Sequence, residues 1–430
     1  MKNFRSVWIL SFLLLVSLFG SSQPVNPVID SLIKGITAGS YRSYFDSLRT
    51  GNHCSRKVME TDRQSSDHDA CRDYVFRKFQ EYLGQGNVFL DEFCVDNSSG
   101  LANIIAFKKG RSLSTIVISA HYDTNNSNEE NVFVPLCAPG ANDNGTGLAA
   151  VLEIARVLAG IETEYSVLFA VWDYEERFTD GFGSGSNYWF SNHVVRKKNQ
   201  KALDYVSGEK LHLNQIAANL NFDMFGHPND TLQGKLVLWA CTGDVRHSGF
   251  VDEYISAINR YVPEIAVANF GKMAYSDHFT FAARKIPAIE NLESNYDIDP
   301  FYHTCFDNFE NPENVDFGFA ASVTKGGLAF LLEKTGVVSG KGSDIVFPTV
   351  NVSVENKFYS IQVPRNGSVS VYAPMGNSIR TRRKGGLCYF RAPSSGLYRV
   401  TVHSDTGSVT KDVYLQKKGD LFASLRSLFF

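Results

Sequence analysis

Two near-continuous apolar runs, separated by one amphipathic segment, constrain the fold of this chain more than any other feature. The runs cover residues 115–120 and 166–172 and contain several β-branched residues, as strands buried on both faces do. Between them, five apolar residues recur at helical spacing: Leu148, Val151, Leu152, Ala155 and Leu158. A strand, helix, strand order with a single connecting helix predicts parallel pairing through a right-handed crossover.

The same alternation continues along the chain to about residue 335. The further elements that it predicts are strands at 217–222, 235–240 and 286–290 and helices at 248–261 and 314–334. This order predicts an α/β domain, residues 23–335, with a mixed, mostly parallel central sheet sandwiched by helices. In open sheets of this kind, functional side chains collect at the carboxyl ends of the strands.

The pattern changes after Lys334. Residues 336–344 are small and polar, which predicts a linker between domains. Residues 345–430 carry short alternating runs, which predict a separate all-β, sandwich-like module.

Charge excludes one class of function. The chain has 42 Lys and Arg against 45 Asp and Glu, a net charge of −3. No global basic field is present, so we expect no nucleic-acid partner.

The N-terminus has the pattern of a targeting segment. The apolar run Val7–Phe19 is too short to span a bilayer core of roughly 30 Å. It follows Lys2 and Arg5 and precedes the small residues 20–22, which is the order of a secretory signal peptide. We expect residues 1–22 to be removed and the protein to be secreted, extracellular or at the cell surface, without stable membrane insertion. An uncleaved anchor is the alternative.

Seven cysteines are widely spaced and form no CxxC pair, which argues against a structural zinc knuckle. In an oxidising compartment, the disulfide that we expect is Cys54 with Cys71.

Potential metal ligands fall at the ends of the expected strands or next to the helices. They are His121, Asp143, Glu176, Asp223 and His303. Each has an ordinary alternative, such as a polar pair, a solvated turn or a helix cap. Five such sites at one edge of one sheet are explained more simply by one shared centre.

Imidazole and carboxylate donors without thiolate suit zinc. Two ions about 3.5–4 Å apart need a shared carboxylate, and Asp143 is placed to be that bridge. Asp123, two residues after His121, is the expected orienter of its imidazole. Glu175, next to Glu176, is left free to act as the general base that activates the attacking water.

Six motifs then carry a resemblance to a known family. They are residues 121–123 (HYD), 141–147 (ANDNGTG), 173–176 (DYEE), 221–224 (NFDM), 275–278 (YSDH) with 286–289 (IPAI), and 302–304 (YHT). In this order, over about 185 residues, they resemble the M28 family of zinc aminopeptidases.

The resemblance implies a two-zinc exopeptidase that acts on the N-termini of peptides or proteins. One zinc would take His121, Asp143 and Asp223, and the other Asp143, Glu176 and His303. It also implies a non-proline cis peptide bond directly after Asp143.

Other residues depart from the family or have open roles. Tyr302 resembles the tyrosine that donates to the oxyanion, with packing as an equal alternative. Tyr174 stands where a smaller residue is commoner and is expected to narrow the pocket. The connection between Asp123 and Asp143 is longer than is usual in the family, and its polar segment, residues 125–130, is expected to form a rim over the site. His278 is not expected to bind metal.

Two other functions remain open on this fold. One is glutaminyl cyclisation, typically with one zinc, and the other is a non-catalytic surface binding protein. The presence of both His121 and Asp143 favours the hydrolase, and no ligand is missing.

The C-terminal module resembles the sorting domain that directs proteins through the type IX secretion machinery, which we expect as a partner. The resemblance rests on residues 368–372, 375–376, 395–400 and 411–415. A generic immunoglobulin-like module is the alternative.

Overall fold

The computed structural model describes most of the first 338 residues and the strands of the C-terminal module. The described ranges are 24–50, 56–58, 64–95, 98–128, 137–177, 184–195, 211–311, 314–338, 352–355, 358–362, 368–372, 378–384, 387–390, 396–404 and 407–415.

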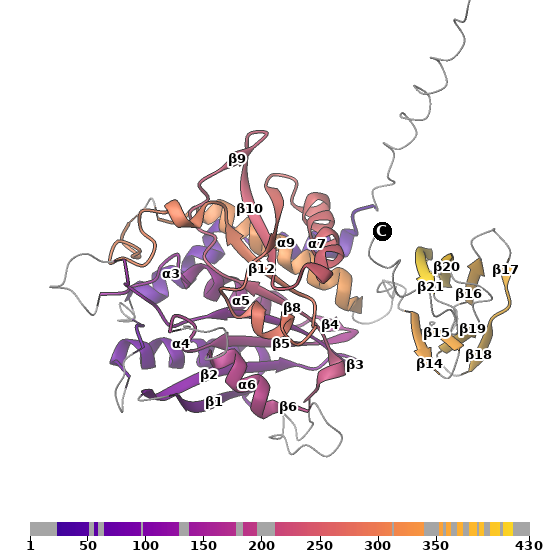
Figure 1. The fold of residues 1–430 in the computed structure, drawn as a ribbon, viewed down its shortest axis with the longest axis horizontal. Coiled ribbons are helices and arrows are strands. Elements are labelled where there is room, and N and C mark those ends of the chain that lie inside the picture. Colours follow the sequence, from indigo (N-terminus) through magenta and orange to yellow (C-terminus); the bar gives the residue numbers. More distant parts are fainter. Residues whose placement is uncertain are drawn as a thin grey trace, which may run out of the picture. The chain divides into compact units, whose positions relative to one another are not determined.

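A nine-stranded sheet forms the centre of the larger unit (Figure 1). Its order is β1–β2–β5–β3–β8–β12–β10–β11, with β9 paired to β10. The strands are β1 (Val88–Val95), β2 (Ser98–Lys108), β3 (Ser112–His121), β5 (Tyr165–Trp172), β8 (Ile216–Phe222), β9 (Thr231–Leu232), β10 (Lys235–Thr242), β11 (Ala266–Lys272) and β12 (Ala288–Glu293).

The sheet is parallel at its centre and mixed towards its edges. Strand β8 pairs parallel with both β3 and β12, whereas β10 runs antiparallel to β12 and parallel to β11. Strands β1, β2 and β5 pair antiparallel. The predicted fold class, a mixed, mostly parallel sheet flanked by helices, is confirmed. The carboxyl ends of β3, β8 and β12 therefore meet at one edge.

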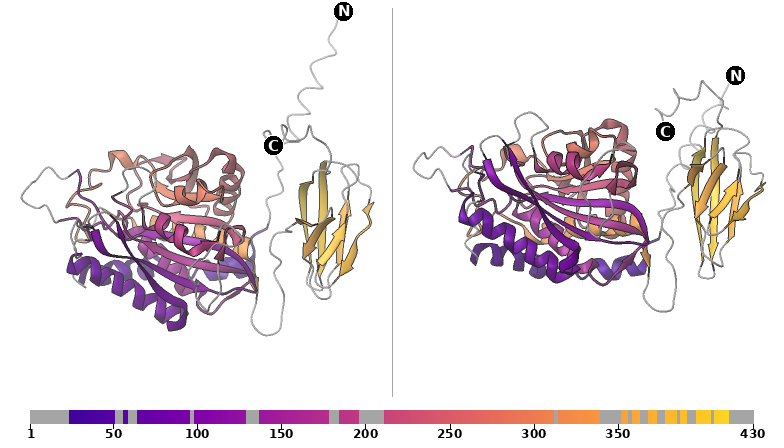
Figure 2. Two further views of the ribbon diagram at one scale, coloured as in Figure 1. Left: turned by 60° about the horizontal axis from the view of Figure 1, so that its bottom comes forward. Right: turned by 90° about the horizontal axis from the view of Figure 1, so that it is seen from below.

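Helices cover both faces of this sheet (Figure 2). They are α2 (Pro27–Ile33), α3 (Ala38–Thr50), α4 (Ser66–Leu83), α5 (Gly145–Leu158), α6 (Gly185–His193), α7 (Ser248–Tyr261), α8 (His278–Ala282) and α9 (Phe317–Thr335). The side chains of β5 alternate between the two layers. Leu168, Ala170 and Trp172 pack with residues of α6 and α8, whereas the Phe169 ring lies 6.0 Å from that of Phe79 on α4.

Two short strand pairs lie outside the main sheet. Strand β6 (Val194–Val195) pairs parallel with β7 (Leu211–His212), and β13 (Val337–Val338) pairs antiparallel with β4 (Glu162–Thr163). Strand β13 lies within the range expected to be a linker.

In its described residues, the C-terminal module forms two four-stranded antiparallel sheets. Their orders are β14–β15–β19–β18 and β17–β16–β20–β21. The strands are β14 (Val352–Glu355), β15 (Phe358–Gln362), β16 (Ser368–Tyr372), β17 (Ser378–Ile379), β18 (Arg382–Lys384), β19 (Leu387–Phe390), β20 (Gly396–Ser404) and β21 (Gly407–Leu415). The expected signal segment, residues 1–22, and most of the linker lie outside the described residues, so the domain boundaries stay predictions.

None of the helices in the described ranges combines the length and the apolar character that crossing a membrane requires.

Candidate metal centre

The structure brings all five predicted ligands to the carboxyl edge of the sheet. His121 is the last residue of β3, and Asp223 follows β8. Glu176 lies in the turn after β5, and Asp143 lies just before α5. His303 belongs to the segment that precedes α9, so the last ligand comes from a loop rather than from a strand end.

The Asp143 carboxylate lies between the two histidines. Its Oδ1 is 3.3 Å from Nε2 of His121, and its Oδ2 is 3.1 Å from Nε2 of His303. The two histidines also face other carboxylates, since His121 Nε2 lies 3.1 Å from Asp223 Oδ1 and His303 Nε2 lies 3.0 Å from Glu176 Oε2. Donor atoms of His121, Asp143 and Glu176 all lie within 4.8 Å of one another.

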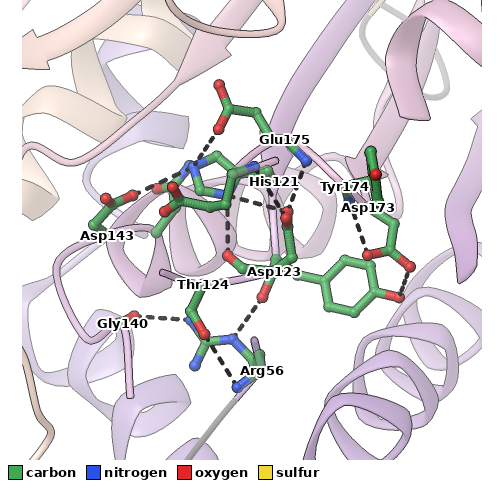
Figure 3. A network of polar contacts seen from close by, with 12 residues as sticks. Arg56, His121, Asp123, Thr124, Gly140, Asp143, Asp173, Tyr174 and Glu175 are labelled. Atoms are coloured by element: carbon green, nitrogen blue, oxygen red, sulfur yellow. Dashed lines mark hydrogen bonds and ion pairs between the residues drawn. The ribbon is translucent and has the colours of Figure 1, made fainter. Parts of the chain in front are cut away.

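Asp123 lies against His121, as expected, and also contacts the turn that carries the two glutamates, which the sequence did not predict. Nδ1 of His121 lies 3.1 Å from the backbone carbonyl of Asp123, to which it can donate, and 3.5 Å from the carboxylate. The carboxylate itself accepts hydrogen bonds from the backbone N–H groups of Glu175 and Glu176, at 3.1 and 3.0 Å. One residue therefore links the orientation of the imidazole to the turn that carries both glutamates (Figure 3).

Asp307 holds the segment that carries Asp143. Its carboxylate accepts hydrogen bonds from the backbone N–H groups of Asn142 (2.6 Å) and Asp143 (2.9 Å), and from Nδ2 of Asn314 (2.6 Å). Asn144 caps α5 by accepting from the N–H of Gly147. The expected cis peptide bond between Asp143 and Asn144 is present.

Arg56 is a second support that sequence reasoning missed. Its guanidinium is fully buried and donates to three backbone carbonyls, those of Tyr122 (2.6 Å), Pro139 (2.7 Å) and Gly140 (2.8 Å). These contacts hold the residues after β3 to the chain that leads into Asp143 (Figure 3). No spacing in the sequence signals this role, because the partners are backbone atoms far away in the chain.

A buried ion pair lies behind the glutamate turn. Asp173 accepts from Nε2 of His68 on α4 (3.0 Å) and from the hydroxyl of Tyr122 (2.8 Å). Burial alone would lower the pKa of His68, but the Asp173 carboxylate outweighs it and raises that pKa to about 9.

The electrostatics of the centre favour a cation. Burial raises the pKa of Glu175 well above its ordinary value, more than nearby His121 lowers it. Burial and the charge of Asp143 raise the pKa of Glu176 to about 7. Against the effect of burial, Glu176 and Asp143 raise the pKa of His303 to about 10.

The donor set fits zinc. Oε1 of Glu176 has no hydrogen-bond partner among the described residues, which leaves this buried oxygen able to bind a metal. Carboxylates of four residues, those of Asp143, Glu175, Glu176 and Asp223, face two imidazoles. A divalent cation would neutralise this excess of negative charge, and its ligands would be imidazole and carboxylate.

A cavity of about 390 Å³ opens beside the donors. Tyr302 lines it, and its ring stacks on that of His303 with a centroid distance of 3.9 Å. Asn125 also lines the cavity, and Ser127 Oγ lies 3.0 Å from Nδ1 of His303, so the described part of the expected rim does lie at the site. Tyr174 does not line the cavity.

Tyr174 packs instead in a hydrophobic cluster with Val58, Phe93 and Leu101, so the expectation that it narrows the pocket is wrong. His278 is buried, and its Nε2 lies 3.1 Å from the carbonyl of Met273. The expected partner of Cys71, Cys54, lies outside the described residues, and Cys71 itself is buried.

Imidazole and carboxylate donors at the carboxyl edge of a mixed sheet between helices define an α/β protein with a zinc-type centre. The chain belongs to peptidase family M28, whose family model matches residues 103–323, just over half of the chain.

Known proteins support this assignment. Leucine aminopeptidase 1 of Leptosphaeria maculans is 31% identical over 215 residues, which cover 49% of this chain and 50% of the relative. The chain thus spans about half the length of that curated relative.

Solved structures share the fold. The leucine aminopeptidase precursor of Bacteroides thetaiotaomicron is 20% identical, with a TM-score of 0.52 over 69% of this chain and 96% of the other. Glutaminyl cyclase of Tannerella forsythia is 18% identical, with a TM-score of 0.53 over 69% of this chain and 98% of the other.

Proposed function

We propose that this chain is a zinc-dependent aminopeptidase that uses two zinc ions to hydrolyse the first peptide bond of peptides or proteins. The observation that carries the proposal is the position of Asp143, which turns one carboxylate oxygen towards each histidine. A carboxylate shared in this way is what a pair of metal ions requires.

Each ion would have its own ligands beside the shared carboxylate. His121 and Asp223 would complete one site, and Glu176 and His303 the other. When bound, the ions supply Lewis-acid chemistry, which polarises the scissile carbonyl and makes water more acidic.

Glu175 is the residue that moves the proton. It lines the cavity, and its Oε2 lies 4.0 Å from Nε2 of His121. Because burial raises its pKa, its carboxyl group can hold the proton taken from the attacking water until the leaving amine accepts it. Tyr302, also on the cavity wall, is placed to donate from its hydroxyl to the oxygen of the scissile carbonyl.

The glutaminyl cyclases have the same fold, so the choice between activities rests on the ligands. A shared carboxylate with a histidine on each side favours hydrolysis, because the cyclisation reaction typically needs one zinc.

The test measures zinc per chain together with hydrolysis of aminoacyl amides, the same amides with acetylated amines, and a glutaminyl peptide. We expect two zinc ions, cleavage only of free-amine substrates, and no cyclisation. Cyclisation without hydrolysis, or cleavage of the acetylated amides, would refute the proposal.

We also propose that the protein is exported through a leader at residues 1–22 and delivered by its C-terminal module through the type IX machinery. The order of charge and hydrophobicity in the leader and the motifs of the module support this. Secretion of a reporter fused to residues 336–430, compared in bacteria with and without that machinery, tests it. Equal secretion in both strains would count against it.

A further inference from the structure

The cavity beside the metal ligands has an apolar wall with one carboxylate in it. Met224, Met273 and Leu292 line it and pack together in one hydrophobic cluster. Glu290 lines the same cavity and is only 2% exposed. A carboxylate among apolar lining residues is the kind of placed polar group that determines which ligand a pocket accepts.

The strand register explains why Glu290 lies behind the apolar wall. Successive side chains of a strand point to opposite faces, so Glu290 and Leu292 of β12 share a face. Strand β12 runs parallel to β8 towards the edge that carries the metal ligands. Glu290 is therefore two residues further from that edge than Leu292, on the floor of the pocket.

Glu290 has no cationic partner in the described part of the chain. The only Lys, Arg or His nitrogen there within 4.0 Å of its carboxylate is Nδ1 of His278, at 3.3 Å. Burial lowers the pKa of His278 to about 4, so this imidazole is neutral. Neither this nitrogen nor Oε2 of Glu290 has a hydrogen-bond partner among the described residues.

Burial makes a cation more favourable still, because it raises the pKa of Glu290 well above its ordinary value. A positive charge that entered the pocket would reverse this shift, because an opposite charge stabilises a buried carboxylate.

We propose that Glu290 receives the cationic side chain of an N-terminal lysine or arginine residue and makes the enzyme selective for basic N-termini. This inference rests on the proposed aminopeptidase function. The stem of such a side chain would contact Met224, Met273 and Leu292, and its charged end would reach the carboxylate, as amphipathic side chains commonly do.

The experiment compares lysine amides with norleucine amides, which have nearly the same chain length but lack the charge. For the wild-type enzyme we expect kcat/KM to be at least about 100-fold higher for the lysine substrate, because a site built for a polar group rejects an analogue that lacks it. In Glu290→Gln and Glu290→Met this ratio should fall to about 1, mainly through the lysine substrate. Asp297→Asn, at an exposed carboxyl in the neighbouring pocket, is the control and should keep the wild-type ratio within about threefold.

The ratio separates selectivity from a structural role. If Glu290 only stabilised the fold or bound the α-amine, its variants would lose both substrates equally and the ratio would not change. A wild-type enzyme that cleaves norleucine amides as well as lysine amides would overturn the inference even if no variant folded.

Binding of free lysine and free norleucine to the zinc-loaded protein distinguishes this inference from the proposed function. If neither amide is cleaved but lysine binds more tightly than norleucine, and only when Glu290 is present, the proposed activity fails and the pocket assignment stands. If both amides are cleaved without preference, the activity stands and the assignment of Glu290 fails.

Discussion

The Asp307 carboxylate accepts a hydrogen bond from the backbone N–H of Asp143 at 2.9 Å, across 164 residues of chain. A second bond, from the N–H of Asn142, fixes the direction in which the shared carboxylate leaves the backbone. Groups that orient metal ligands typically change metal affinity by 10–100-fold when they are altered.

Replacing Asp307 should therefore weaken zinc binding. In Asp307→Asn, an amide N–H₂ replaces one of the two acceptor oxygens and faces a backbone donor. We expect the zinc dissociation constant to rise by roughly 10–100-fold, with a parallel loss of kcat/KM, as measured by competition with a chelator.

Asp316→Asn is the matched control, because Asp316 also accepts from two backbone N–H groups, those of Gly318 and Phe319 at the start of α9. Its zinc affinity should equal that of the wild type. Unchanged zinc affinity in Asp307→Asn would show that Asp307 does not position Asp143.

Substitutions of the two adjacent glutamates, Glu175 and Glu176, should have opposite effects on zinc content. Glu175→Gln removes the proposed base but no ligand, so zinc should stay bound while kcat falls by roughly 10²–10⁴-fold. Glu176→Ala and His303→Ala should lose zinc and activity together. Zinc analysis beside kcat provides the test, and loss of zinc in Glu175→Gln would mean that the two glutamate roles are exchanged.

The His68–Asp173 pair should make stability depend on pH in the alkaline range. The folded protein raises the pKa of His68 from 6.5 to about 9, so the stabilisation is complete below pH 6.5 and is lost as the pH rises through 9. The shift corresponds to roughly 3 kcal/mol.

Denaturant unfolding of the wild type and His68→Gln at about pH 6 and about pH 10 measures this contribution. The difference in unfolding free energy between the two proteins should shrink by that amount at the higher pH. A difference that is independent of pH would show that the pair is not charged in the folded protein.

Truncation should separate the C-terminal module from the chemistry. All proposed ligands and the base lie between His121 and His303, so a chain that ends after Gly340 should keep its zinc and its kcat/KM within about threefold. A chain that ends after Thr335 also loses β13, which pairs with β4, and should melt at a lower temperature. If the chain that ends after Gly340 keeps its zinc but has a much higher KM, the module would be part of the substrate cleft.

Local patterns were sufficient to predict the elements with strong periodicity. Helix α7 has the predicted bounds, Ser248–Tyr261. Three of the proposed ligands, His121, Glu176 and Asp223, were predictable for a related reason, because each lies where an apolar run gives way to polar residues.

The predicted strand at 286–290 ended too early, because β12 continues to Glu293. Polar residues can extend a buried strand when the fold supplies partners, as it does for Asn291, which accepts from the hydroxyl of Tyr254, and for Glu293, which accepts from Nδ2 of Asn142. Because the predicted strand ended at Glu290, the sequence did not show that Glu290 lies inside a longer strand, on the floor of the pocket. Arg56 and Asp307 could not be predicted at all, because their partners are backbone groups brought close only by the tertiary fold.

The position of Asp143 between His121 and His303 also has a consequence for the timing of activity. The two histidines are 182 residues apart in the sequence, and contacts between distant segments form late because closing a long loop costs entropy. A chain still emerging from the ribosome has His121 and Asp143 long before His303. The Asp143 carboxylate then has only one of its two histidine neighbours, so the proposed two-metal site can form only after most of the domain has been synthesised.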